Sequence, residues 1–194
     1  MAHYNACMSD PSENPLVVEA TRQWLEKVVI GLNLCPFAAF PWRQGRVRFR
    51  VSDACDQQRL AEDLADELLA LQAWVPVECE TTLLIHPQVL GDFPDYNDFL
   101  DLADRLLEDL ALDGTLQIAS FHPDYQFADS RPDDPANCTN RSPYPMLHLL
   151  REASIEAATA NLPDPDVIFE RNIKTMRELG MDGWKELMNL WAET

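Results

Sequence analysis

Strand-type and helix-type segments alternate through the middle of this chain, and their order restricts the fold more than any other feature of the sequence. The strand-type runs are Arg46 to Val51, Thr81 to Ile85 and Leu116 to Phe121. Between them, apolar residues recur at helical spacing over Asp56 to Trp74 and Asp95 to Leu110. Crossovers of this length join parallel strands. We therefore expect an α/β domain with a small, at least partly parallel sheet flanked by helices.

Helical patterns also precede and follow this region. Pro15 to Asn33 has the spacing of an amphipathic helix, and Asn14 with Pro15 is a typical helix beginning. After the third strand we predict a helix from Pro143 to Ala160, with Ser142 as its N-cap. The C-terminal part is then predicted to be helical on both sides of a stop at Gly180.

The first strand-type run alternates between arginine and apolar residues, which predicts a half-buried strand. Its arginines share one face and could bind an anion. We prefer the interpretation of an edge strand whose charges oppose aggregation beside the acidic helix that follows. The carboxylates of that helix that we expect to face solvent are Glu62, Asp63, Asp66 and Glu67.

Composition and charge exclude several classes of function. A chain of 194 residues with 46% hydrophobic content can form one substantial core, so we expect a single domain over residues 1–194 with residues 1–14 as a flexible tail. The formal charge of -18 repels nucleic acids and anionic membranes, so we expect neither as a partner. No segment has the length and apolar character of a membrane span or a signal peptide. The five cysteines form no CxxC pair, which favours reduced thiols in the cytoplasm.

A long irregular segment follows the third strand. Its residues from His122 to Pro145 include five prolines. Loops of this length in compact domains are usually disordered or functional. The presence of Tyr125, Phe127 and Tyr144 argues for order, because disordered segments are poor in aromatic residues. We therefore expect a packed loop that forms a site.

A histidine followed by proline ends two of the predicted strands. If these strands run in the same direction, His86 and His122 lie at their carboxyl ends, the edge where open α/β sheets bind ligands. Our first hypothesis is an enzyme in which His122 is a general acid or base and Asp124 or Tyr125 orients it. Cys35 precedes a proline and is a candidate nucleophile, although a small buried side chain is the simpler interpretation.

The predicted helix start adds an anion site to this hypothesis. Free backbone N–H groups beside the guanidinium of Arg141 would attract a carboxylate or phosphate. A second stripe of the same helix would add His148 and Arg151. We therefore expect a small anionic metabolite in a pocket formed by residues 122–151, bound by Asn140, Arg141, Ser142, His148 and Arg151.

Two other functions fit the same residues. A metal-dependent enzyme would hold a divalent metal between His86, His122 and a carboxylate from Asp124, Asp133 or Asp134. A noncatalytic ligand-binding or interaction module would use the loop only for recognition. The chain contains no P-loop, GxGxxG, HExxH or GxSxG motif, which argues against the usual nucleotide-binding, zincin and esterase sites.

Five sequence motifs resemble those of one uncharacterised bacterial family, catalogued as domain of unknown function 1415. They are GLNLCPFA, TTLLIHP, DYNDFLDLAD, QIASFHPDYQFA and TNRSPYPMLHLLREAS. The resemblance extends roughly from Trp24 to Trp184. It implies a single compact bacterial domain but assigns no substrate and no catalytic residue.

Overall fold

The computed structural model describes residues 14–160 and 166–189. Residues 1–13 of the predicted tail and the linker at 161–165 lie outside the described residues. The helices are α1 (Pro15–Trp24), the π-helix η1 (Leu25–Ile30), α2 (Ala39–Arg43), α3 (Gln57–Ala73), α4 (Phe93–Asp109), the 3-10 helix η2 (Pro135–Thr139), α5 (Glu152–Thr159) and α6 (Asp166–Asn189). The strands are β1 (Val47–Val51), β2 (Thr81–Ile85), β3 (Leu116–Phe121) and β4 (Met146–Arg151).

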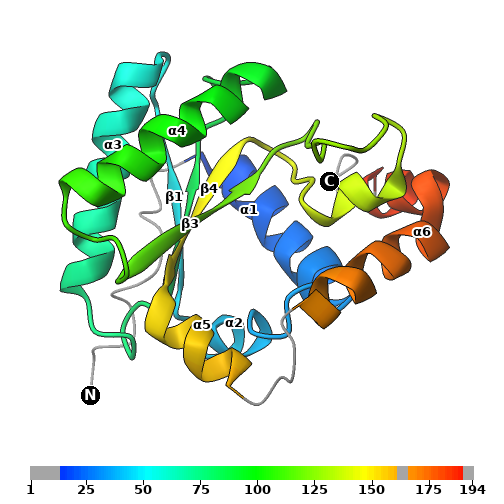
Figure 1. Ribbon diagram of the computed structural model, residues 1–194, viewed down its shortest axis with the longest axis horizontal. Coiled ribbons are helices and arrows are strands. Elements are labelled where there is room, and N and C mark those ends of the chain that lie inside the picture. The colour runs from blue at the N-terminus through cyan, green and yellow to red at the C-terminus, as the bar shows by residue number, and fades with distance from the viewer. Residues whose placement is uncertain (1–13, 161–165, 190–194) are drawn as a thin grey trace.

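The four strands form one mixed sheet in the order β1-β2-β4-β3. β1 and β2 are parallel, whereas β4 runs antiparallel to both of its neighbours. β1, β2 and β3 therefore point in the same direction, and β1 lies at an edge. In Figure 1 the α3–α4 layer lies on one side of this sheet and α1 with α6 on the other. The predicted single α/β domain with a partly parallel sheet is confirmed.

The predicted helix from Pro143 to Ala160 is wrong over its first half, because Met146–Arg151 forms the strand β4. Only Glu152–Thr159 is helical. The run MLHLL is apolar enough to suit either structure, and a strand buried between two neighbours needs no alternation. Pro145 was the sequence signal against a helix, since it disfavours helical geometry at Tyr144.

The arginine face of β1 packs against α3, as predicted for an edge strand beside an acidic helix. Arg48 forms an ion pair with Glu67 at 3.0 Å, and Arg50 approaches the same carboxylate at 3.5 Å. Glu67 and Asp63 are buried, so their predicted place on the solvated face is wrong. Asp63 accepts a hydrogen bond from Ser52 at 2.6 Å. Asp63 also pairs with Arg59 at 2.9 Å, and these two contacts offset the cost of burying its carboxylate.

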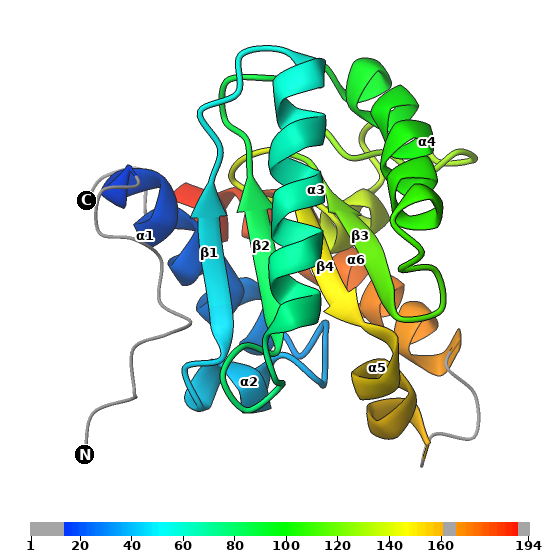
Figure 2. The same ribbon diagram turned by 90° about the vertical axis from the view of Figure 1, so that its left-hand side faces the viewer.

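Two apolar clusters fill the faces of the sheet, and Figure 2 shows α3 lying across one of these faces. Leu147 and Leu149 of β4 join the cluster under α3 and α4. Met146 joins the cluster formed with α1 and η1, which also contains Trp24. β4 therefore contributes to both cores, and each buried side chain of this size adds about 1.5–3 kcal/mol of transfer free energy.

The predicted first and last helices are both interrupted. The Pro15–Asn33 pattern divides into α1 and η1. Pro15 begins α1 as expected, but the Asn14 side chain makes no capping hydrogen bond. In α6 the backbone leaves helical geometry at Gly180, where φ is 70°, which confirms the predicted stop. Among the described helices, none is long and apolar enough to cross a membrane.

Tyr96 of α4 joins β3 to β4 at the end of the sheet that carries the two histidines. Its hydroxyl donates a hydrogen bond to the Met146 carbonyl at 2.8 Å and accepts one from the Phe121 N–H at 3.0 Å. The side chain is fully buried. One oxygen atom thus satisfies two backbone groups that belong to neighbouring strands.

We predict that Tyr96→Phe lowers the free energy of unfolding by on the order of 2 kcal/mol, because both backbone groups lose their partner. Urea unfolding followed by circular dichroism measures this change. Tyr125→Phe is the matched control, since no hydrogen bond of the Tyr125 hydroxyl is present among the described residues, and we expect a change below about 0.5 kcal/mol. Equal effects of the two substitutions would contradict this role of Tyr96.

Candidate functional site

His86 and His122 lie at the carboxyl ends of β2 and β3, as the sequence predicted. Both side chains are fully buried. The ring of Tyr96 lies near both, with centroid distances of 5.8 Å to His86 and 5.1 Å to His122. The strand order explains this meeting, because β2 and β3 run in the same direction with β4 between them.

Both ring nitrogens of His122 contact the main chain. Nδ1 accepts a hydrogen bond from the Asp124 N–H at 3.0 Å, and Nε2 lies 3.1 Å from the Leu90 carbonyl oxygen, to which it donates. Burial lowers the pKa of His122 more than the Leu90 contact and the nearby Asp124 and Asp92 raise it. A neutral ring with both nitrogens engaged has no free lone pair with which to take a proton from a substrate.

The residues expected to assist His122 do not converge on its ring. The Asp124 side chain is exposed, and only its backbone N–H is hydrogen-bonded to the imidazole. The Tyr125 ring packs against Phe93 at 5.2 Å and against Phe127 at 5.1 Å. Tyr125 therefore lies in an aromatic cluster instead of orienting the histidine.

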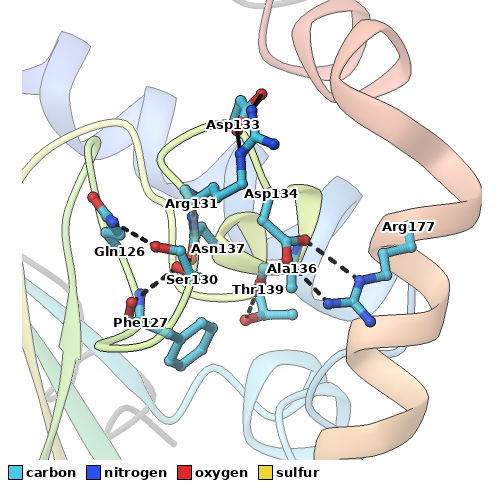
Figure 3. Close-up of polar contacts among 10 residues, drawn as sticks. All are labelled: Gln126, Phe127, Ser130, Arg131, Asp133, Asp134, Ala136, Asn137, Thr139 and Arg177. Carbon is cyan, nitrogen blue, oxygen red and sulfur yellow. Dashed lines mark hydrogen bonds and ion pairs between the residues drawn. The ribbon is translucent and has the colours of Figure 1, made fainter.

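The long loop is ordered by its own hydrogen bonds, as Figure 3 shows. The carbonyl oxygen of the buried Asn137 side chain accepts from the Phe127 N–H at 3.1 Å and from the Ser130 hydroxyl at 2.6 Å. Its amide nitrogen donates to the Arg131 carbonyl at 2.8 Å. The loop is packed and ordered, as expected. The Asn137 side chain holds it in place by hydrogen bonds to the backbone and to Ser130.

Arg141 is held inside the same loop. Its Nε donates to the Tyr125 carbonyl at 3.2 Å and its Nη2 to the Pro132 carbonyl at 3.0 Å. The neighbouring Asn140 donates to the Ser120 carbonyl, and Ser142 donates to the Tyr144 carbonyl. No helix begins at Ser142, so the predicted set of free helical N–H groups is absent from this place.

Arg151 and His148 lie away from Arg141 because β4 is extended. Five steps along a strand separate Met146 from Arg151, a distance of about 17 Å. The Arg151 Nη2 donates to three carbonyls at the end of α3 and just after it, those of Leu71, Trp74 and Cys79. The predicted pairing of Arg141 and Arg151 around one anion is wrong.

His148 lies within β4 and contacts Thr81. Its Nε2 is 2.7 Å from the Thr81 hydroxyl oxygen, and that hydroxyl donates to the Leu149 carbonyl at 2.6 Å. The imidazole must therefore donate to Thr81. Burial lowers the pKa of His148 to about 4.

The donors proposed for a divalent metal do not form a cluster. Within residues 14–160 and 166–189, no group of three or more histidine, cysteine, aspartate or glutamate side chains is placed to hold a metal ion. Asp133 pairs with Arg131 at 3.2 Å, and Asp134 pairs with Arg177 of α6 at 3.0 Å (Figure 3). The Arg177 contact lowers the pKa of Asp134.

Cys35 lies at a different place, where the turn after η1 meets α6. Its side chain is partly exposed, and burial raises the pKa of the thiol. The backbone N–H groups of Phe37 and Ala38 and the charge of Arg171 act in the opposite direction. Cys35 is thus a neutral thiol beside three groups that favour negative charge. In the sequence, the proline after Cys35 indicated an irregular turn here. The contact of Cys35 with Arg171 of α6 depends on the tertiary structure.

One residue of structural importance, Tyr96, was not singled out by the sequence. Tyr96 precedes Phe99 by three residues on the buried face of α4, so its burial was predictable but the strand-bridging hydroxyl was not. Arg171 and Asn172 carry no motif, but in the C-terminal segment they are the two residues for which the sequence suggested a place in a site. They reach the backbone of the Cys35 turn, where Arg171 donates to Asn33 and Asn172 to Leu34.

We predict that Arg141→Ala loosens the loop, because the carbonyls of Tyr125 and Pro132 lose their donor. Hydrogen exchange measured by mass spectrometry should show faster exchange over residues 125–132 and a loss of stability of about 1–3 kcal/mol. Arg131→Ala is the control in the same loop. Its ion pair with Asp133 is exposed, and we expect an effect near zero. Unchanged exchange in Arg141→Ala would contradict the scaffolding role.

A comparison with protein families matches residues 16–186 to the family described as "Protein of unknown function (DUF1415)". No curated protein and no solved structure matches the chain.

Proposed function

Because the chain belongs to DUF1415, a family of proteins of unknown function, we propose a function from its own geometry: it binds a small carboxylate- or phosphate-bearing molecule beside Cys35 and Arg171. This retains the anionic ligand expected from the sequence but moves it from Arg141 to the turn after η1. Binding is favoured over acid/base catalysis at the strand ends, where both nitrogens of His122 are engaged by the main chain.

The proposal rests on Arg171, whose guanidinium has N–H groups that the described residues leave unpaired. Its Nη2 donates to the Asn33 carbonyl at 2.6 Å and lies 3.5 Å from the Asn172 side-chain oxygen. Among the described residues, Nε and Nη1 make no hydrogen bond and no carboxylate pairs with this guanidinium. In a chain of formal charge -18, a partly exposed arginine without a carboxylate partner is a natural place for an external anion.

The Cys35 thiol supports the same ligand class. Burial keeps the thiol protonated at neutral pH, so it does not repel an anion. The N–H groups of Phe37 and Ala38 already face its sulfur. A ligand oxygen at this turn would meet an uncharged thiol on one side and the Arg171 guanidinium on the other.

The local backbone holds these groups in place before a ligand arrives. η1 is a π-helix, a form that occurs often at functional sites. Asn33 has a left-handed backbone with φ of 53°. Arg171 and Asn172 then fasten the carbonyls of Asn33 and Leu34 to α6. Such preorganisation reduces the ordering cost of binding.

We also propose that the protein acts in the cytoplasm of a bacterial cell. Four described cysteines, Cys35, Cys55, Cys79 and Cys138, are free thiols. A reducing compartment would maintain them in this form.

Alkylation of the thiols by iodoacetamide, followed by mass spectrometry, tests the proposed site. The partly buried Cys35 should react more slowly than the exposed Cys55 at pH 8, since burial raises its pKa. Inorganic phosphate should slow the Cys35 reaction further, by at least threefold at saturation, and leave Cys55 unaffected.

Arg171→Gln should remove the protection by phosphate while an amide donor remains available to Asn33. Arg105→Gln is the control, because Arg105 lies on the exposed face of α4 and donates to the backbone of its own helix. A Cys35 rate that phosphate does not change in the wild-type protein, or protection that survives in Arg171→Gln, would overturn the proposed site.

A further inference from the structure

His86 and His122 bind two neighbouring carbonyls of one short connection between β2 and α4. The Nδ1 of His86 lies 3.0 Å from the Val89 oxygen, and the Nε2 of His122 lies 3.1 Å from the Leu90 oxygen. Leu90 has a left-handed backbone with φ of 57°, which is unusual for a leucine. Two imidazoles from different strands therefore hold a turn in a conformation that its own residues do not favour.

These contacts fix which nitrogen of each ring carries a proton, and an accepted hydrogen bond makes the His122 ring neutral. A carbonyl oxygen only accepts, so the proton of His86 is on Nδ1 and that of His122 is on Nε2. The remaining nitrogen of His122 accepts from the Asp124 N–H at 3.0 Å. The remaining nitrogen of His86 is buried and has no hydrogen-bond partner among the described residues.

A second proton would break this arrangement at both rings. On His122 it would place an N–H donor against the N–H of Asp124. On His86 it would create a buried N–H without an acceptor, which costs the desolvation of a charged group. The two positive charges would also repel each other, because a charged His122 disfavours a charged His86.

The charged and titratable groups around the pair do not compensate for burial. Asp92 at the start of α4 and Asp124 of the loop favour a charged His122, but burial outweighs them and lowers its pKa. His122 itself disfavours a charged His86, whose pKa falls to about 4, mainly through burial. Tyr96 and Phe93 complete the surroundings with uncharged rings, since burial raises the pKa of Tyr96.

We propose that His86 and His122 form an acid-sensitive latch, in which protonation releases the turn at residues 86–92 together with the beginning of the long loop at residues 122–128. The latch is independent of the anion site proposed above. Histidines with a folded-state pKa below the unfolded value of about 6.5 keep their full stabilising contribution above that pH. The contribution is lost as the pH falls below about 6.5, for His86 down to its folded-state pKa of about 4, and each histidine can raise the opening equilibrium up to tenfold per pH unit.

Hydrogen exchange of the full chain at pH 7.0 and 5.0, corrected for the intrinsic pH dependence of exchange, tests the latch. Protection over residues 86–92 and 122–128 should fall more than tenfold at pH 5.0. Protection of the buried α3 residues between Leu60 and Leu71 should remain. A uniform loss over all segments indicates global unfolding and would overturn the proposal, as would unchanged protection in the two segments.

Substitution separates the latch from general acid sensitivity. His122→Gln should reduce the pH dependence of the two segments, whereas His148→Gln, which removes a partly buried histidine from the middle of β4, should not. If His122→Gln does not fold, the wild-type protein still decides the question. The NMR titration of the His122 ring must then coincide with the loss of protection, and a titration midpoint above pH 6.5 would refute the latch.

Discussion

The hydroxyl of Tyr96 is the contact on which the histidine end of this sheet depends. It binds β4 at Met146 and β3 at Phe121, and its ring lies close to both strand-end histidines. α4 thus fixes the ends of both strands through a single side chain. Because β4 enters the sheet between β2 and β3, any shift of this contact would move both histidines and the loop that begins at His122.

The polar residues of the long loop stabilise backbone that would otherwise lack partners. Asn137, Arg141 and His122 each bind main-chain groups, which is how a structure without regular elements satisfies its buried amides. Side chains that resemble catalytic groups in the sequence are here used for scaffolding. The anion site that we propose relies instead on donors of Arg171 that no described residue engages, at the opposite end of η1 from the sheet contact of Trp24.

The sequence predicted three strands of an at least partly parallel sheet, the edge position of β1 and the place of His86 and His122 at one edge of the sheet if their strands share a direction, because these follow from alternation and crossover length. It did not predict β4, since the run at Met146 suits a helix as well as a buried strand. That one error produced the false anion site at Ser142 and Arg151. The contact between Cys35 and Arg171 could not be predicted for another reason. Arg171 is 136 positions away in the sequence, and hydrophobic periodicity indicates local structure only.

The strand-end histidines act as neutral structural groups at neutral pH, and the protonation of their ring nitrogens is the most direct test of this role. A long-range proton–nitrogen NMR spectrum of the histidine side chains at pH 7.5 reports which nitrogen carries the proton. We expect a proton on Nε2 alone for His122 and on Nδ1 alone for His86. An imidazolium at either position, or the opposite tautomer of His122, would contradict the account.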